Sequence, residues 1–262
     1  MSKRNQRNLI YALSLIMVWS LPIMAFMRPD SPESSQLTYT LAWEWGDAMQ
    51  TETGWQVTNN LGYTIEVTEG YIVAYEAQLN ACEHSHGWFN WDWLTIPSVY
   101  AGHGDDSNDS SLRTSYVENI ALPETTAWGT VNLAEPTYCE AFFLVARGAT
   151  DTLNQPESVD MFATSIYLSG TVTAPDNDDA MPFTLQTQHA NGTVQPFLQD
   201  EQSVHLALSY DDMEIAIVRS LDTLFDEIDF ANDSSDDASF QVLRNLLNNT
   251  QFHVISGTTH KN

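Results

Sequence analysis

The sequence has few basic residues. It contains 9 lysines and arginines against 35 aspartates and glutamates, which gives a formal net charge of −26 over 262 residues. A field of this sign repels nucleic acids and anionic lipid surfaces, so neither is expected as a partner. The same field attracts cations without selecting between them. A strongly acidic composition is also typical of proteins that are adapted to remain soluble or to function at high salt. The charge therefore excludes partners without identifying a function.

The sequence also lacks the short motifs of common enzyme classes. It contains no G-x-S-x-G nucleophile elbow, no H-E-x-x-H metalloprotease motif and no P-loop. Its carboxylates are too numerous for one pair to stand out as a general acid and base. We therefore predict that the protein is not an enzyme. A zinc hydrolase with an open coordination position is the alternative that the sequence leaves open.

Long hydrophobic runs are lacking after residue 27. The basic residues within positions 1–8 precede an apolar run over 9–27, which is the layout of a secretory signal. The run is also near the minimum length of a spanning helix, roughly 17–20 residues. We expect residues 1–27 to be a signal peptide or a retained N-terminal anchor and residues 28–35 to be a linker. The remainder is expected in the periplasm or outside the cell, attached to the inner membrane only through an uncleaved N-terminal segment.

Cysteine occurs only at Cys82 and Cys139. In an oxidising compartment two cysteines are expected to form a disulfide. A loop of the size that they would close contributes roughly 4 kcal/mol of stability in the chain-entropy account. The disulfide would clamp the base of a segment that carries three histidines. The alternative is that Cys82 is a thiolate ligand of a metal ion.

Alternation of apolar and polar residues predicts strands over most of the chain. Leu37, Tyr39 and Leu41 alternate with polar or small residues, which is the two-residue period of a strand. The same period recurs over 63–67, 166–172, 183–185, 204–210 and 213–217. Short strands separated by turn-forming residues predict an antiparallel β-sandwich. Asp211 and Asp212 are expected to form a two-residue turn between the last two of these strands.

The end of the chain changes to helical spacing. The apolar residues of a first predicted helix, with Ser220 as its N-cap, are Leu221, Leu224, Phe225 and Ile228. Those of a second, after a start signal at 234–237, are Phe240, Leu243 and Leu247. We therefore predict one mainly β domain over 36–252, a sandwich with two short C-terminal helices, followed by a tail over 253–262.

Histidine is scarce but clustered. Three of the seven histidines, His84, His86 and His103, lie close together in the sequence. In an extended segment the first two point to the same face, and imidazole is the commonest transition-metal side-chain ligand. We expect these three residues to be ligands of one copper or zinc ion. The alternative is that they are ordinary residues of a polar surface loop.

Three imidazoles leave a fourth coordination position open. Water, Asp105 or Met161 are the candidates, and the sequence leaves open whether His189 or His205 joins the site. The acidic run over 105–109 also offers oxygen ligands for a weak calcium site. It lacks the glycine and the glutamate of an EF-hand loop, so a solvated loop is the alternative.

An aromatic run follows His86. Trp88, Trp91 and Trp93 are candidates for a hydrophobic lid over the metal site, since a tryptophan face can contact a soft cation. Large aromatic side chains mainly supply buried area, so packing in the core is the alternative.

The layout resembles a loose group of exported bacterial proteins. Its matching residues are Cys82, His84, His86, His103, Tyr138-Cys139 and the segment 165–170. The segment 221–230 is similar to the C-terminal region of MbnP-like periplasmic copper-binding proteins. This resemblance implies a periplasmic role in metal handling.

These observations predict an exported transition-metal-binding protein that captures, stores or delivers copper or zinc. The expected partners are the metal ion and a membrane metal transporter or another envelope protein. The alternative is a non-catalytic envelope or surface interaction module that binds a protein or glycan through exposed tryptophans.

Overall fold

The computed structural model describes residues 35–82, 110–133, 137–177, 179–207, 212–256 and 258–261. All of them belong to one compact unit, which begins at Ser35. Within these residues, no helix has the length and apolar character needed to cross a membrane. The predicted signal peptide or anchor over 1–27 lies outside the described residues, and so does most of the predicted linker.

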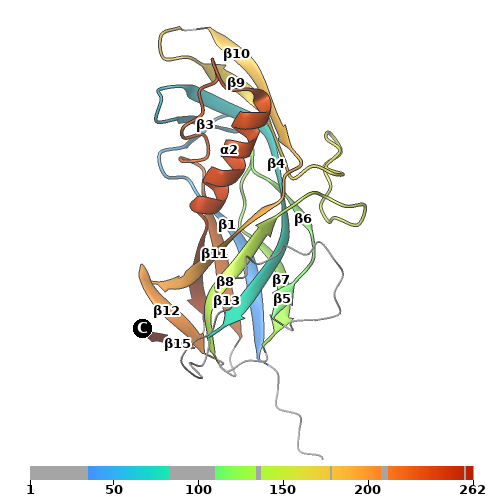
Figure 1. Ribbon diagram of the computed structural model, residues 1–262, viewed down its shortest axis with the longest axis vertical. Helices are drawn as coiled ribbons and strands as arrows, with labels where there is room; N and C mark the ends of the chain where they lie inside the picture. Colours follow the sequence, from blue (N-terminus) through green and yellow to red (C-terminus); the bar gives the residue numbers. More distant parts are fainter. Residues whose placement is uncertain are drawn as a thin grey trace, which may run out of the picture. The chain divides into compact units, whose positions relative to one another are not determined.

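The unit is mainly β, as the sequence predicts, with a single helix among the described residues (Figure 1). Its elements are β1 (Gln36–Glu44), β2 (Met49–Gln50), β3 (Trp55–Thr58), β4 (Thr64–Ala81), β5 (Ser111–Leu112), β6 (Tyr116–Asn119), β7 (Thr126–Asn132), β8 (Thr137–Val145), β9 (Ile166–Thr173), β10 (Ala180–Thr187), β11 (Asn191–Gln199), β12 (Gln202–Ala207), β13 (Met213–Ser220), α2 (Ser235–Asn248), β14 (Gln251–Ser256) and β15 (Thr258–Lys261).

The strands form one large mixed sheet, and the two stacked sheets of the predicted sandwich are not confirmed. The hydrogen-bonded order is β10-β9-β4-β8-β12-β11-β14-β13-β1-β7, and β15 pairs with β12 off this path. The pairs β1–β13 and β11–β14 are parallel, and the other pairs are antiparallel. The strands on either side of Asp211 and Asp212 do not pair with each other, because β13 lies between β1 and β14. The prediction of a two-residue hairpin turn between β12 and β13 is therefore wrong.

The residues expected to form a C-terminal tail contribute to the sheet. Positions 253–256 complete β14, and β15 adds a further strand beside β12. Phe252 and Val254 are buried, which explains the incorporation of β14, since their alternation matches the period of a strand with one face on the core.

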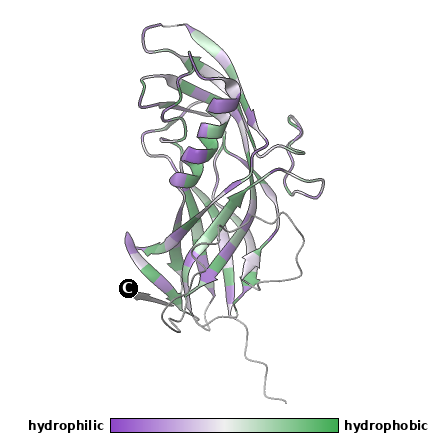
Figure 2. Cartoon of the chain, viewed as in Figure 1, coloured by the Kyte–Doolittle hydropathy of each residue, from purple (hydrophilic) through white to green (hydrophobic). Residues whose placement is uncertain are grey.

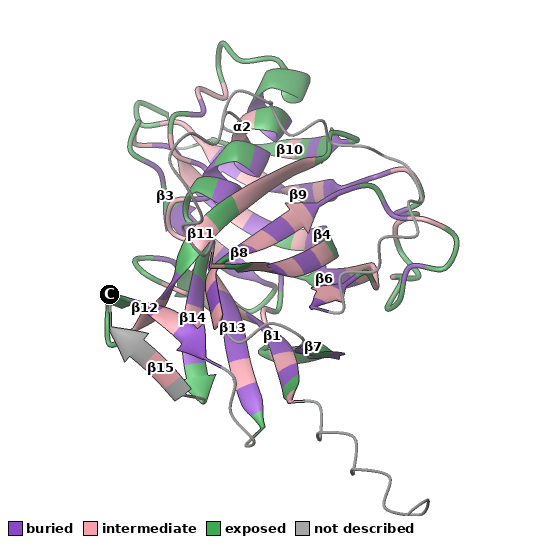
Figure 3. Ribbon diagram, turned by 60° about the horizontal axis from the view of Figure 1, so that its bottom comes forward, coloured by how far each residue is buried: buried purple, intermediate pink, exposed green. Residues whose placement is uncertain are grey.

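The core lies on the face of each strand that the alternating pattern marks. In β1 the side chains of Leu37, Tyr39 and Leu41 are fully buried, and Ile215 and Ile217 of β13 are fully buried beside them. Buried and half-buried residues alternate toward the ends of these two strands, whereas Thr40 and Ala216 in their middles are buried as well (Figure 3). Hydrophobic and hydrophilic bands both occur along the strands (Figure 2). This part of the prediction is confirmed.

The second predicted helix is confirmed as α2. Ser234 is its N-cap, and its hydroxyl oxygen accepts a hydrogen bond from the backbone N–H of Asp237 at 3.1 Å. Leu243 and Leu247 are buried as expected, whereas Phe240 is 40% exposed. The Phe240 ring instead contacts the ring of His189 at 5.3 Å between centroids.

The first predicted helix is wrong, because the segment 221–228 forms consecutive turns. Its backbone hydrogen bonds run from residue i+3 to residue i, such as Leu224 N–H to Leu221 O at 3.3 Å. Carbonyl groups that a helix would use internally accept from side chains elsewhere in the fold. Asn59 donates to Phe225 O and Ile228 O, both at 3.0 Å.

The side-chain amide of Asn245 also donates hydrogen bonds to carbonyl groups of the segment 221–228. It donates to the carbonyl oxygens of Leu224 at 3.2 Å and Asp226 at 2.7 Å. The apolar residues of the segment, Leu221, Leu224, Phe225 and Ile228, are nevertheless all fully buried. The spacing therefore identified the buried face correctly but not the backbone conformation.

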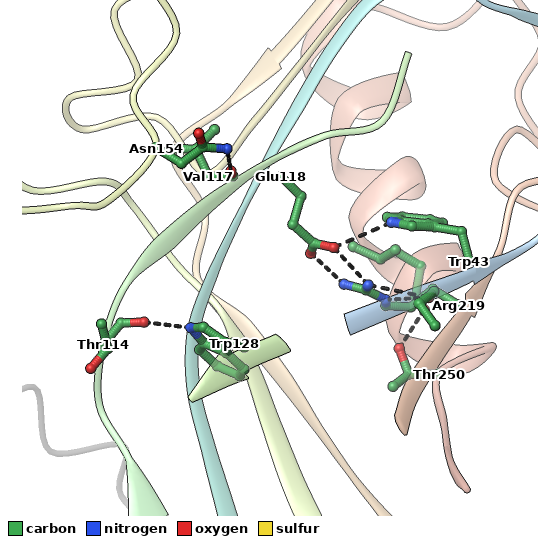
Figure 4. A network of polar contacts seen from close by, with 10 residues as sticks. Trp43, Thr114, Val117, Glu118, Trp128, Asn154, Arg219 and Thr250 are labelled. Atoms are coloured by element: carbon green, nitrogen blue, oxygen red, sulfur yellow. Dashed lines mark hydrogen bonds and ion pairs between the residues drawn. The ribbon is translucent and has the colours of Figure 1, made fainter. Parts of the chain in front are cut away.

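Arg219 and Glu118 form a buried ion pair. Arg219 of β13 is fully buried, and its guanidinium donates to both carboxylate oxygens of Glu118 in β6 (Figure 4). The indole N–H of Trp43 donates to the same carboxylate at 3.2 Å, and the guanidinium carbon lies 4.4 Å from the centre of the Trp43 ring. Such a pair needs these additional contacts, because removing two charges from water is costly.

Candidate metal centre

Most of the residues that the sequence nominates as a metal site fall outside the described part of the chain. These are His84, His86, His103, Asp105, Trp88, Trp91 and Trp93. Their roles as ligands and as a lid stay predictions, as does the weak calcium site over 105–109. The structure describes the two cysteines that flank this segment, together with Met161, His189 and His205.

The predicted disulfide between Cys82 and Cys139 is confirmed. Their Cα atoms are 4.9 Å apart, and the bond joins residues separated by 57 positions. Cys82 directly follows β4, and its backbone N–H donates to Thr137 O of β8 at 3.1 Å. Cys82, the last described residue before position 83, is therefore held by the disulfide and by a backbone hydrogen bond. A disulfide is typical of proteins in oxidising compartments.

An extra residue in β8 accompanies the disulfide. Asn80 pairs with Glu140 and Ala81 with Tyr138, so Cys139 has no direct partner in β4. Tyr138 is buried on the core side, whereas Cys139 is half-buried and Glu140 is exposed. A bulge of this kind redirects side chains locally. Here two successive residues of β8 lie away from the core.

The structure adds His205 to the neighbourhood of the disulfide. Leu206 of β12 pairs with Tyr138, which brings His205 level with Cys139 on the adjacent strand. Leu206 is fully buried and His205 is half-buried, as alternation along β12 requires. One ring nitrogen of His205 and the sulfur atoms of Cys82 and Cys139 lie within 4.8 Å of one another.

A further histidine occupies the next position across the sheet. His260 of β15 is the register partner of His205 of β12. The side chains of Cys82, Cys139 and His205 lie close together across the end of β4, β8 and β12, and we call these three residues the Cys–His row. β12 pairs with β8, which pairs with β4, and β15 pairs with the other side of β12 (Figure 1).

His189 lies at the opposite end of β8. It precedes β11, which begins opposite Val145, whereas Cys139 is near the other end of the strand. Val145 is six positions after Cys139 along β8, a distance of about 20 Å at roughly 3.3 Å per residue. Of the two histidines that the sequence left open, His205 lies at the disulfide and His189 does not.

Met161 lies in the core. Its side chain is fully buried and packs in a small cluster with Val73 and Val117. It was nominated as a sulfur ligand. The structure places it among apolar neighbours, and its role as a ligand stays a prediction.

No known protein family, curated protein or solved structure matches this chain. The resemblance to MbnP-like copper-binding proteins therefore stays a prediction. The candidate site is argued from its own residues. In the oxidised protein the two sulfur atoms are bonded to each other and are not thiolates, which are the form of cysteine that ligates metals. Within the Cys–His row, the His205 imidazole is then the available metal ligand.

Proposed function

We propose that the protein is an exported binder of one copper or zinc ion, which it captures, stores or delivers. His84, His86 and His103 are the proposed ligands, and His205 is added to them. Such a role involves no catalysis by the protein itself. A membrane metal transporter or another envelope protein is the proposed recipient or donor of the ion.

The position of His205 carries this proposal. Its ring lies within 4.8 Å of the Cys82 sulfur, and His84 follows Cys82 by two positions in the chain. Consecutive Cα atoms are about 3.8 Å apart, so the Cα of His84 can be no more than about 7.6 Å from that of Cys82. An imidazole fixed on a strand is thus within reach of the first histidine of the cluster.

The ligand chemistry suits the proposed ions. Four imidazole nitrogens match the donor preferences of Zn(II) and Cu(II), and three would leave a position for water. The net charge of −26 favours the approach of a cation, although charge alone does not select between metals.

The test is the metal content of the oxidised protein, purified without a histidine tag and measured by elemental mass spectrometry. We expect about one copper or zinc ion per chain, lost in the triple variant His84→Ala, His86→Ala and His103→Ala. The single variant His205→Ala should weaken binding by about tenfold or more, since loss of even outer-sphere partners has effects of this size.

His189→Ala is the matched control, because this described histidine lies at the other end of β8. Its metal content should equal that of the unmodified chain. Absence of bound metal, together with no uptake on titration with Cu(I), Cu(II) or Zn(II), would reject the proposal. The interaction module that binds a protein or glycan would then be the better hypothesis.

A further inference from the structure

We propose that reduction of the disulfide turns the Cys–His row into a second, thiolate-based metal site. Its ligands are Cys82, Cys139 and His205. The site uses none of the histidines over 83–109 and shares only His205 with the site proposed above. It differs from that site in using two thiolates, and it therefore requires the reduced protein.

The geometry supplies three ligands without rearrangement of the sheet. The two sulfur atoms and one His205 ring nitrogen already lie within 4.8 Å of one another. Two thiolates on a tetrahedral zinc ion, each about 2.3 Å from the metal, are about 3.8 Å apart. Rotation of the cysteine side chains provides this separation once the bond between the sulfur atoms is broken.

The backbone that carries these ligands is held by contacts other than the disulfide. The N–H of Cys82 donates to Thr137 O at 3.1 Å, and Cys139 belongs to β8, which is paired with β4 and β11. His205 is held in β12 by pairing with both β11 and β15. Reduction therefore removes one covalent bond, and the pairings β4–β8 and β8–β12 still align the Cys–His row.

The site is accessible to the reagents that it needs. Cys82, Cys139 and His205 are each half-buried, not enclosed in the core. A small dithiol and a metal ion can therefore reach them from solvent. Two thiolates and one imidazole, with water in the fourth position, form a donor set typical of tetrahedral Zn(II), and thiolates also favour Cu(I).

The chemistry balances with a dithiol as the reductant. The dithiol gives two electrons to the Cys82–Cys139 bond and becomes a disulfide, and its two protons appear on the cysteine thiols. Binding of Zn(II) then releases those two protons as both sulfur atoms coordinate as thiolates. Reoxidation by a second disulfide, through thiol exchange, would release the metal. The affinity of the protein for metal therefore depends on the ratio of thiols to disulfides in the surrounding solution.

The test uses the His84→Ala, His86→Ala and His103→Ala variant, which separates this site from the one proposed above. The protein is reduced with a dithiol, desalted without oxygen and titrated with Zn(II), and in parallel with Co(II) as a spectroscopic probe. We expect one ion per reduced chain, thiolate-to-cobalt charge-transfer absorption, and no such binding by the oxidised protein. Failure of the first proposal would appear only in the oxidised, unsubstituted chain.

Further variants assign the ligands. In the reduced protein, His205→Ala should lower the affinity by about tenfold or more, whereas His189→Ala should leave it unchanged. Equal binding by the reduced and oxidised forms would overturn the proposal, as would a His205→Ala affinity equal to that of His189→Ala. Near-ultraviolet circular dichroism reports folding. A reduced chain that loses its native spectrum and does not regain it with Zn(II) would also overturn the proposal.

Discussion

At the scale of single residues, the contact between Arg219 and Glu118 shows how the fold keeps a charge in its interior. The guanidinium is fully buried, faces the carboxylate, donates to Ala42 O at 3.2 Å and stacks on Trp43. Each of these contacts compensates part of the hydration that the guanidinium loses on burial. Removing one partner therefore lowers the free energy of unfolding by more than the intact pair contributes to it.

We expect Glu118→Gln to lower the free energy of unfolding by about 3–5 kcal/mol, because it leaves the buried Arg219 charge without an opposite charge. Urea denaturation measures this. The pair between the half-exposed Arg113 and the partly buried Glu76, at 2.9 Å, is the control, since its guanidinium keeps contact with water. Glu76→Gln should change stability by about 1 kcal/mol or less.

A double variant separates charge from packing at this position. Glu118→Leu combined with Arg219→Met should be less destabilised than Glu118→Gln, since apolar replacements of similar volume leave no buried charge. Equal losses for Glu118→Gln and Glu76→Gln would contradict the account of a buried, unpaired guanidinium.

At the scale of elements, the segment 221–228 shows that a helical spacing of apolar residues does not fix a helix. Its carbonyl groups accept hydrogen bonds from the side-chain amides of Asn59 and Asn245, which come from distant parts of the chain.

A further side-chain contact lies just beyond the segment 221–228. The Tyr63 hydroxyl donates to Asp229 at 2.6 Å, and this bond, followed by bonds from Asn232 and from the backbone, lowers the pKa of the Asp229 carboxyl.

Asn59→Ala should destabilise the protein by about 2–4 kcal/mol, because Ile228 O loses its side-chain donor and Phe225 O keeps only the backbone N–H of Ile228. Asn59 is itself buried, and its side-chain oxygen also accepts from the backbone of Leu61 and Tyr63. Chemical denaturation measures the loss in the free energy of unfolding, and Asn177→Ala is the control. Asn177 is exposed and caps only a local turn, so its loss should be about 0.5 kcal/mol or less. Similar losses at the two positions would refute the role given to Asn59.

At the scale of the whole molecule, the sheet joins segments that are far apart in the sequence. The parallel pair β1–β13 connects the first described strand with one near the C-terminus, and β14 then lies between β13 and β11. Such pairings require long stretches of chain to be ordered first, which is entropically costly. The disulfide reduces this cost in one part of the chain by closing the loop between β4 and β8.

Removing the disulfide by Cys82→Ala and Cys139→Ala should lower the free energy of unfolding by about 4 kcal/mol in the chain-entropy account. The measurement is the denaturation midpoint and slope of the variant against the oxidised protein. Both cysteines are bonded, so treating the oxidised protein with an alkylating reagent is a control that should change neither value. An unchanged midpoint in the double variant would show that the loop is already restrained in the unfolded chain.

The sequence by itself determined the local features of this protein. The alternation in β1 and β13, the N-cap at Ser234 and the pairing of the two cysteines were all readable, because each depends on near neighbours or on a unique choice of partner. The buried face of 221–228 was also readable, since burial follows spacing even where the backbone does not.

Only the tertiary structure decided which strands are neighbours, and with that the composition of the Cys–His row. His205 meets the cysteines because β8 and β12 adopt one particular register. Register between distant strands depends on the packing of the whole sheet, and no local pattern around His205 encodes it. The same reason explains why Asp211 and Asp212 looked like a hairpin turn although β12 and β13 have different partners.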